Sequence, residues 1–393
     1  MKDYRFDGSI SLEVLNNYLD RAVTYTGHFM PTLYSDTDQK NIDEAIRFIT
    51  NVGAKYIQRA GGEWHPSVVP LNNFDTIKAN ISSAHEIDPD IIFESCIFEV
   101  VTSAVNEIPI PAYVFEAFEM EPEKRNFNMD GMAFSDGYKG NFDPGTIVPD
   151  VTKTETQMFI YYRACLFIDM GFEALHLGQV LLTGRAEPNN ETYTKVIGMI
   201  REYAKKHARR HYVLINAHNN EFTAPDGTML VDMIVAPIRP APADDETDHE
   251  VSEENPQRCV LKANYWKSVY QSGISGTSPS GWYAERYPYL VEFDNYGGKL
   301  GDTSKKDSYV WGLDEISWYA SQPQWYRREF MQYAIDKINS FEENGHVAFV
   351  GYRGGQYNSM LGEKQQYYAN GSDFCKLGQN DEEFIKAILN SGT

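Results

Sequence analysis

The sequence predicts a (β/α)8 barrel, the TIM-barrel fold, with long loops between some strands and helices. Short apolar or alternating segments recur along the chain, and stretches with helical periodicity separate most of them. This alternation is typical of parallel α/β architecture. The 393 residues also exceed the about 250 of a typical barrel, which leaves room for long loops. A doubly wound open sheet is the alternative, although no GxGxxG or GxxxxGK[ST] motif follows any predicted strand.

Eight segments predict the strands of this barrel. Turn residues bound them, and most are rich in β-branched and aromatic residues. In chain order they cover residues 22–29, 54–60, 91–96, 172–178, 212–218, 229–238, 289–297 and 346–354.

Amphipathic helices are predicted between most of these strands. The segment 38–52 places Ile42, Ala45 and Ile49 on one face and ends before Gly53. The other predicted helices cover 11–20, 73–87, 112–118, 154–170, 190–208, 325–341 and 381–389. No convincing helix links the sixth strand to the seventh.

Two long segments interrupt the alternation. The first, 98–150, is rich in Pro, Gly and acidic residues, and the second, 239–288, contains an acidic, proline-rich stretch. We interpret both as loop insertions into one barrel domain that spans 1–393. Residues 354–393 would form a C-terminal extension with a short helix.

Composition limits the classes of partner. The chain carries 56 acidic against 35 basic residues, a formal net charge of −21, which argues against nucleic acid as a ligand. No apolar run approaches the about 20 residues needed to cross a bilayer, so we expect a soluble protein. The four cysteines lack CxxC spacing, which indicates thiols rather than a zinc site. The compartment and the oligomeric state stay open.

Polar residues recur at the predicted carboxyl ends of the strands, where the active site of a barrel of this kind lies. An interior filled only for stability would carry Val, Ile and Leu, so these side chains predict a catalytic or binding site. They are His28, Glu94, His176, Asn216, His218, Glu292 and Asp294, and Arg353 follows the last strand.

The segment YLVEFDNYG (289–297) places Glu292 and Asp294 on one face of a strand. A solvated acidic edge strand is the alternative interpretation. Our leading hypothesis is hydrolysis of a glycosidic bond by two carboxyl groups. Glu292 would be nucleophile or base, Glu94 the general acid with a pKa raised by burial, and Asp294 a third catalytic carboxylate that orients them.

Aromatic residues indicate a carbohydrate or another small polar ligand. The six tryptophans, at 64, 266, 282, 311, 318 and 325, all follow the second, sixth or seventh predicted strand. Their faces suit the C–H faces of sugar rings, although long loops also need aromatics for packing. The predicted substrate-binding residues are His28, Trp64, His176, Gln179, Asn216, His218, Trp282, Trp311 and Arg353.

Two other functions remain open. A metal-dependent hydrolase or isomerase would bind a divalent ion through His28, Glu94, His176, His218 and Asp294, although HExxH and an HxH on the first strand are absent. The leading hypothesis itself needs no cofactor. A carbohydrate-binding protein with an inactive barrel is the third possibility. Glu94 could also form a purely structural ion pair with Arg59.

Four segments resemble those of a family of uncharacterised bacterial proteins of about this length: NVGAKYI, KHARRHYVLINAH, YLVEFDNYG and WGLDEISWYA. That family has no known activity, so the resemblance implies no catalytic residues. Its architecture is similar to that of barrel glycoside hydrolases. The commonest pattern of those enzymes, an Asn-Glu pair after the fourth strand, is replaced here by His176 to Gln179. Glu63, Glu99 and Glu187 therefore compete with Glu94 for the acid role.

Overall fold

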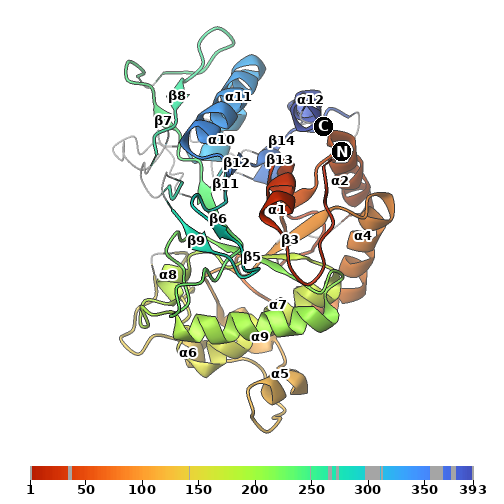
Figure 1. The fold of residues 1–393 in the computed structure, drawn as a ribbon, viewed down its shortest axis with the longest axis vertical. Coiled ribbons are helices and arrows are strands. Elements are labelled where there is room, and N and C mark those ends of the chain that lie inside the picture. Colours follow the sequence, from red (N-terminus) through yellow and green to blue (C-terminus); the bar gives the residue numbers. More distant parts are fainter. Residues whose placement is uncertain are drawn as a thin grey trace.

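The structure is a computed structural model that describes residues 2–33, 38–140, 142–247, 249–263, 268–270, 274–296, 310, 313–354, 366–372 and 378–391. Its central feature is a curled, mostly parallel sheet with helices around it (Figure 1). All eight predicted strand segments contribute to this sheet, so the predicted fold class is confirmed.

Parallel pairing follows chain order around the sheet. The strands are β1 (Ala22–Tyr25), β2 (Tyr56–Gly62), β3 (Ile92–Cys96), β4 (Ala174–His176), β5 (Leu214–Ala217), β6 (Met233–Pro237) and β11 (Tyr289–Glu292). β11 also pairs with β12 (Gly345–Val347), whereas β13 (Phe349–Gly354) pairs with β1. Only Ala348 separates β12 from β13, and its N–H donates to the Val291 carbonyl at 2.8 Å. The eighth strand therefore closes the barrel, and the open-sheet alternative is wrong.

The helices follow the predicted pattern in their main elements. α2 begins after Asp38, whose carboxylate accepts the Lys40 N–H, and ends at Gly53, whose φ of 72° only glycine adopts readily. The helices are α1 (Leu12–Leu19), α2 (Gln39–Val52), α3 (Val69–Asn72), α4 (Phe74–Ile87), α5 (Ala112–Ala117), α6 (Met129–Met132), α7 (Thr154–Met170), α8 (Val180–Thr183), α9 (Glu191–His207), α10 (Glu315–Ser321), α11 (Gln324–Phe341) and α12 (Glu382–Asn390), with the 3-10 helix η1 (Ser103–Glu107).

Two segments depart from the alternation where the sequence does. In the described part of 238–288 there is no helix; two antiparallel pairs occur instead, β7 (Ala241–Pro242) with β8 (Cys259–Val260) and β9 (Gly276–Thr277) with β10 (Tyr283–Ala284). The other segment, after β3, carries η1, α5 and α6, and α5 and α6 pack on α7. Because α7 is covered on several sides, its apolar residues lie all around the helix. β14 (Gln366–Tyr368) adds an antiparallel strand to β13.

Side chains two residues apart on the barrel strands form two stacked layers. The first, which we call the apolar layer, belongs to one cluster with Leu15 and Leu19 of α1 and consists of Ala22, Tyr56, Ile92, Ala174, Leu214 and Leu290. Two residues later on the same strands comes the polar layer, which consists of Thr24, Gln58, Glu94, His176, Asn216 and Glu292. Every member of both layers is at most 1% exposed. The polar layer lies toward the carboxyl ends of the strands and positions the candidate site.

Two further predictions can be compared with the described residues. Cys96, Cys165 and Cys259 are buried free thiols, as expected, and Cys375 lies outside the described residues. Among the described helices, none combines the length and the apolar character that a membrane span requires.

Candidate active site

Glu292 forms the centre of a buried ion-pair network. The Arg59 Nε donates to its Oε2 at 2.6 Å, and the other end of the same guanidinium donates to Oε1. Arg353 donates to Oε2 at 3.0 Å from the neighbouring side of the barrel. Burial by itself would raise the pKa of Glu292, but the two guanidinium groups outweigh it and lower this pKa to about 2. Glu292 is therefore ionised at neutral pH.

An irregularity in β2 presents Arg59 to this network. Arg59 has a positive φ of 57°, and the pairing register of β2 with β3 shifts between Ile57 and Gly61. The end of β2 packs closely against β3. A Cβ on Gly62 would lie 2.8 Å from the Cys96 backbone nitrogen. Only glycine fits there, because its φ is also 114°.

Glu94 lies across the barrel from Glu292 and is completely buried. It accepts hydrogen bonds from the Tyr56 hydroxyl at 2.6 Å, from Asn216 Nδ2 at 2.7 Å and from the Arg59 backbone N–H at 3.0 Å. Burial raises the pKa of Glu94, against the effect of these donors and of the Arg59 charge. The structural ion pair that we considered for Glu94 is not formed in that way, because the Arg59 guanidinium binds Glu292 instead.

His176 ends β4, and His218 directly follows the neighbouring strand β5. His176 Nδ1 lies 2.6 Å from Asn216 Oδ1, and His218 Nδ1 lies 2.8 Å from the Val235 carbonyl. Their rings meet edge to face at a centroid distance of 4.6 Å, and His218 Nε2 lies 3.4 Å from an Arg59 nitrogen. Burial and the nearby positive charge of Arg59 lower the pKa of both rings. Both histidines are therefore neutral at neutral pH.

Asp294 is the carboxylate of this site that is most open to solvent, with 20% of its side chain exposed. Arg239 donates to its Oδ2 at 3.0 Å, and Arg353 lies 3.8 Å from its Oδ1. Burial works in the opposite direction, but these arginines lower the pKa of Asp294. Both acidic residues of β11 and its extension are thus held ionised.

Glu315 joins the ends of β6 and β11, a role that no pattern in the sequence indicated. Its Oε1 accepts from the backbone N–H and the guanidinium of Arg239, at 3.0 and 2.6 Å, and its Oε2 accepts from the Asp294 N–H at 2.7 Å. Burial raises the pKa of Glu315 to about 7. Glu315 is the first residue of α10, and its partner Arg239 lies 76 residues away in the sequence.

Trp64 and Gln179 lie in the loops that follow β2 and β4. The Trp64 indole donates to Asp143 at 2.9 Å and packs against Phe98, whose ring also lies near His176. The Gln179 backbone N–H donates to Glu99 at 3.1 Å. These two predicted ligands of a sugar therefore lie on the same side of the barrel as His176.

His28 lies apart from the Glu292 network. Its ring packs among Tyr25, Tyr352 and Tyr368, next to β13 and β14. Burial lowers the pKa of His28 to about 4. The described residues contain no group of three or more His, Cys, Asp or Glu side chains that could hold a metal ion. The side chains suggested as ligands of a divalent ion, His28, Glu94, His176, His218 and Asp294, form no such group among the described residues.

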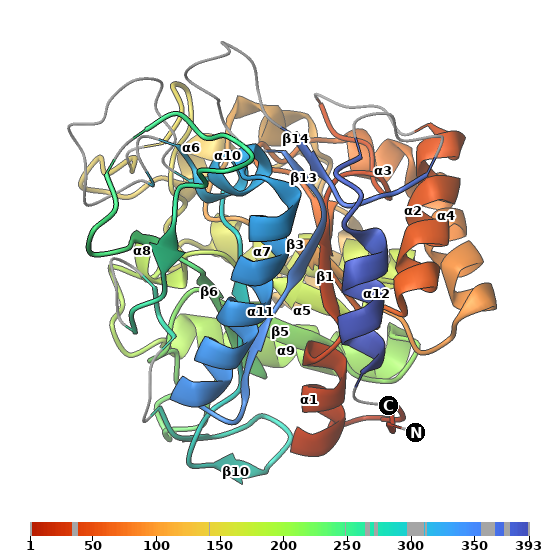
Figure 2. The same cartoon turned by 90° about the horizontal axis from the view of Figure 1, so that it is seen from above.

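The described tryptophans do not all lie at the carboxyl end of the barrel. Trp282 lies at the amino-terminal end of the barrel, where its indole donates to the Ile10 carbonyl at 2.9 Å; Figure 2 shows the adjacent β10 beside α1. Trp318 is fully buried in the core, and Trp325 donates to the Glu253 carbonyl on the outside of α11. Trp266 and Trp311 lie outside the described residues.

The three competing glutamates stabilise local structure. Glu63 pairs with Arg163 at 3.3 Å, and Glu187 accepts the Thr192 N–H at the start of α9. Glu99 accepts the Gln179 N–H in the loop after β4. None of these contacts involves Glu292.

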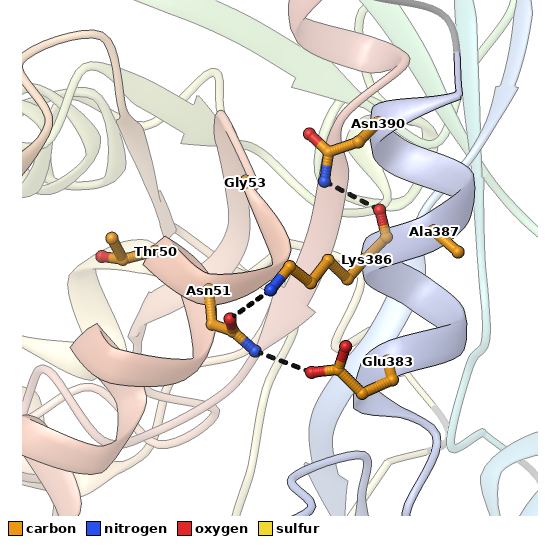
Figure 3. Close-up of a pocket in the computed structure, with 7 residues that line it drawn as sticks. All are labelled: Thr50, Asn51, Gly53, Glu383, Lys386, Ala387 and Asn390. Carbon is orange, nitrogen blue, oxygen red and sulfur yellow. Dashed lines mark hydrogen bonds between the residues drawn. The ribbon is translucent and has the colours of Figure 1, made fainter.

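A separate groove of about 620 Å³ lies between α2 and α12 (Figure 3). Its polar groups pair with one another: Lys386 donates to Asn51, and Asn51 donates to Glu383. The groove is a feature of the contact between two outer helices and contains none of the predicted site residues.

Comparisons with known proteins add structural similarity only. No family profile and no curated protein matches the sequence. A debranching enzyme from Nostoc punctiforme is 11% identical over 95% of this chain and 81% of its own, with a TM-score of 0.44. A trehalose-6-phosphate hydrolase from Bacillus licheniformis is 11% identical over 56% and 49%, with a TM-score of 0.34.

An α-galactosidase from Thermus thermophilus is 13% identical over 57% of this chain and 45% of its own, with a TM-score of 0.32. This chain thus spans about half the length of the hydrolase and the galactosidase that it matches. The solved structures that it is similar to include glycoside hydrolases.

Proposed function

We propose that the protein hydrolyses a glycosidic bond at the carboxyl end of the barrel. One observation supports this function above all: arginines hold Glu292 and Asp294 ionised, while burial raises the pKa of the nearby Glu94. Glycoside hydrolysis needs one carboxyl group that is ionised and one that carries a proton. The site contains carboxyl groups whose environments push their pKa values in these opposite directions.

We assign the carboxyl groups different roles from those that the sequence suggested. Both oxygens of Glu292 accept hydrogen bonds from guanidinium groups. We therefore propose that Glu292 positions Arg59 and Arg353. Asp294 is more exposed and takes the role of nucleophile or base. Glu94 keeps the role of general acid, in which its protonated carboxyl group donates a proton to the oxygen of the leaving group.

The polar and aromatic residues around this network support a neutral sugar as the substrate class. Trp64 and Phe98 offer aromatic faces, and Gln179 and His218 offer polar groups. The net charge of −21 disfavours an anionic ligand.

A carbohydrate-binding protein without turnover is the second candidate. It is favoured by the hydrogen bonds of Glu94 and Glu292, because both carboxyl groups already have partners at each oxygen. Such carboxylates would accept hydrogen bonds from sugar hydroxyls without transferring protons.

The test compares wild type with Asp294→Asn and Glu94→Gln on a panel of aryl glycosides and oligosaccharides. We expect each substitution to lower kcat at least ~100-fold. Glu94→Gln should regain activity on a dinitrophenyl glycoside, because this leaving group departs without a proton, whereas Asp294→Asn should not. Glu187→Gln, which changes a carboxylate at the start of α9, is the matched control.

The outcomes separate the two candidates. Sugar binding measured by calorimetry, with no hydrolysis of any panel member by wild type, would favour the binding protein and contradict the hydrolase. Full activity of Glu94→Gln on every substrate would contradict the acid assignment alone.

A further inference from the structure

The orientation of the Asn216 amide is fixed by its neighbours. Its Nδ2 lies 2.7 Å from a Glu94 oxygen and 3.2 Å from the Tyr56 hydroxyl oxygen, and both atoms can accept a hydrogen bond. The opposite orientation would place the amide oxygen against Glu94 Oε2, which already accepts the Tyr56 hydroxyl hydrogen, and against the oxygen of that hydroxyl. Asn216 Oδ1 therefore faces His176 as an acceptor.

This orientation determines the tautomer of His176. Since Asn216 Oδ1 can only accept, His176 Nδ1 must carry the hydrogen of the 2.6 Å contact. Burial and the charge of Arg59 lower the pKa of the ring, so a second proton is absent at neutral pH. Nε2 is left with a free lone pair and acts as an acceptor.

No described protein group donates to this nitrogen, although His176 is fully buried. The neighbouring His218 differs, because its Nε2 faces an Arg59 nitrogen. Burying an acceptor without a partner is unfavourable, so such a group calls for an explanation. His176 ends β4, in the polar layer that faces the carboxyl end of the barrel.

We propose that His176 Nε2 is the acceptor for one hydroxyl group of the bound sugar. The chain Glu94, Asn216 and His176 presents this lone pair in a fixed direction, which makes His176 a residue that determines specificity. His176 cannot be the general acid, because its free nitrogen bears no proton. The inference rests on the proposed function only in taking the ligand to be a sugar.

The first experiment is nitrogen NMR of the full chain with 15N-labelled histidine. His176 is assigned by the loss of its signals in His176→Asn. We expect an unprotonated Nε2 and a protonated Nδ1 in the free protein. Titration with methyl glucoside, methyl galactoside and methyl mannoside should then shift the Nε2 signal with at least one sugar. A protonated Nε2 in the free protein, or an Nε2 signal that none of the three sugars changes, would overturn the inference.

The second experiment measures affinity by calorimetry. In His176→Asn the side-chain amide keeps a donor near the Nδ1 position and lacks the Nε2 acceptor. We expect it to weaken binding of the responding sugar about 10-fold, the value of one hydrogen bond. One monodeoxy analogue of that sugar should bind wild type about 10-fold more weakly and should bind His176→Asn as the parent sugar does. Additive losses for every analogue would contradict the assignment.

The two proposals can fail separately. A sugar that shifts His176 Nε2 but is never hydrolysed supports this inference and contradicts the hydrolase. Hydrolysis of a sugar that leaves the His176 signal unchanged, together with full affinity in His176→Asn, supports the hydrolase and contradicts this inference.

Discussion

The apolar and polar layers of the barrel interior lie on the same strands and have opposite chemistry. On β11 Leu290 belongs to the first layer and Glu292 to the second, and on β5 the corresponding residues are Leu214 and Asn216. Both layers are completely buried. Burying a leucine stabilises the fold by about 1.5–3 kcal/mol, whereas burying a carboxylate is unfavourable unless it is paired. The apolar layer therefore stabilises the barrel, whereas the polar layer costs stability unless its charges are paired, as expected for residues with a functional role.

The polar layer is expected to be sensitive to the loss of single charges. Replacing a buried ion pair by apolar residues is often neutral, but removing one partner leaves the other charge buried and unpaired. Arg59, Arg353 and Glu292 form such a set, with exposed fractions of 7%, 4% and 0%. The apolar layer should instead respond to lost volume.

The largest effect is expected for Glu292→Gln. The substitution keeps the shape of the side chain, leaves the Arg59 guanidinium without its carboxylate and removes the nearer of the two carboxylates beside Arg353. We expect the free energy of unfolding to fall by about 3–5 kcal/mol in urea denaturation at pH 7. A loss below about 1 kcal/mol would mean that the network does not exist as described.

Leu290→Ala tests the apolar layer on the same strand. Loss of buried methyl groups and the resulting cavity should lower the free energy of unfolding by about 2–5 kcal/mol. Sugar affinity per folded molecule should stay unchanged, because Leu290 lies one layer below the site. A large loss of affinity at full folding would remove the functional distinction between the layers.

Two carboxyl groups give the polar layer and its surroundings opposite dependences on pH. The pKa of Glu292 lies at about 2 in the folded protein, against an ordinary value of 4.5, so its stabilising effect is present above pH 4.5 and is lost as the pH falls toward 2. The pKa of Glu315 is raised to about 7, so its effect is present below pH 4.5 and is lost as the pH rises toward 7.

Glu315→Gln isolates the second of these effects. Between pH 4.5 and 7 the free energy of unfolding of wild type should fall relative to the variant by at most about 3 kcal/mol. Urea denaturation of both proteins at several pH values in this range measures the difference. Parallel curves would show that Glu315 titrates normally.

The smallest effect concerns two tryptophans at opposite ends of the barrel. Trp282→Phe removes the indole donor to Ile10 and should cost about 1 kcal/mol of stability without a change in sugar affinity. Trp64→Ala should weaken sugar binding about 10-fold, as expected for the loss of an aromatic contact surface. Calorimetry on both variants checks the assignment, and equal affinities for the two would place the sugar elsewhere.

Much of the fold could be predicted because its signals are local. Apolar alternation located the strand segments, and the two-residue period placed Glu292 and Asp294 on one face of their strand. Helical periodicity located α2, α7, α9 and α11 within a few residues. Short helices such as α3 and α8 were missed, since four residues carry too little periodicity.

The sequence alone thus determined the barrel and the set of polar side chains at its carboxyl end, because strand and helix periods are written in neighbouring residues. Only the tertiary structure decided which of these side chains meet. Arg59 and Glu292 are separated by 233 residues in the sequence. The irregularity in β2 directs the Arg59 guanidinium toward Glu292 and not toward Glu94. Contacts between distant segments likewise decided at which end of the barrel Trp282 lies and that Glu315 joins the ends of β6 and β11. Such contacts leave no periodic pattern in a single sequence.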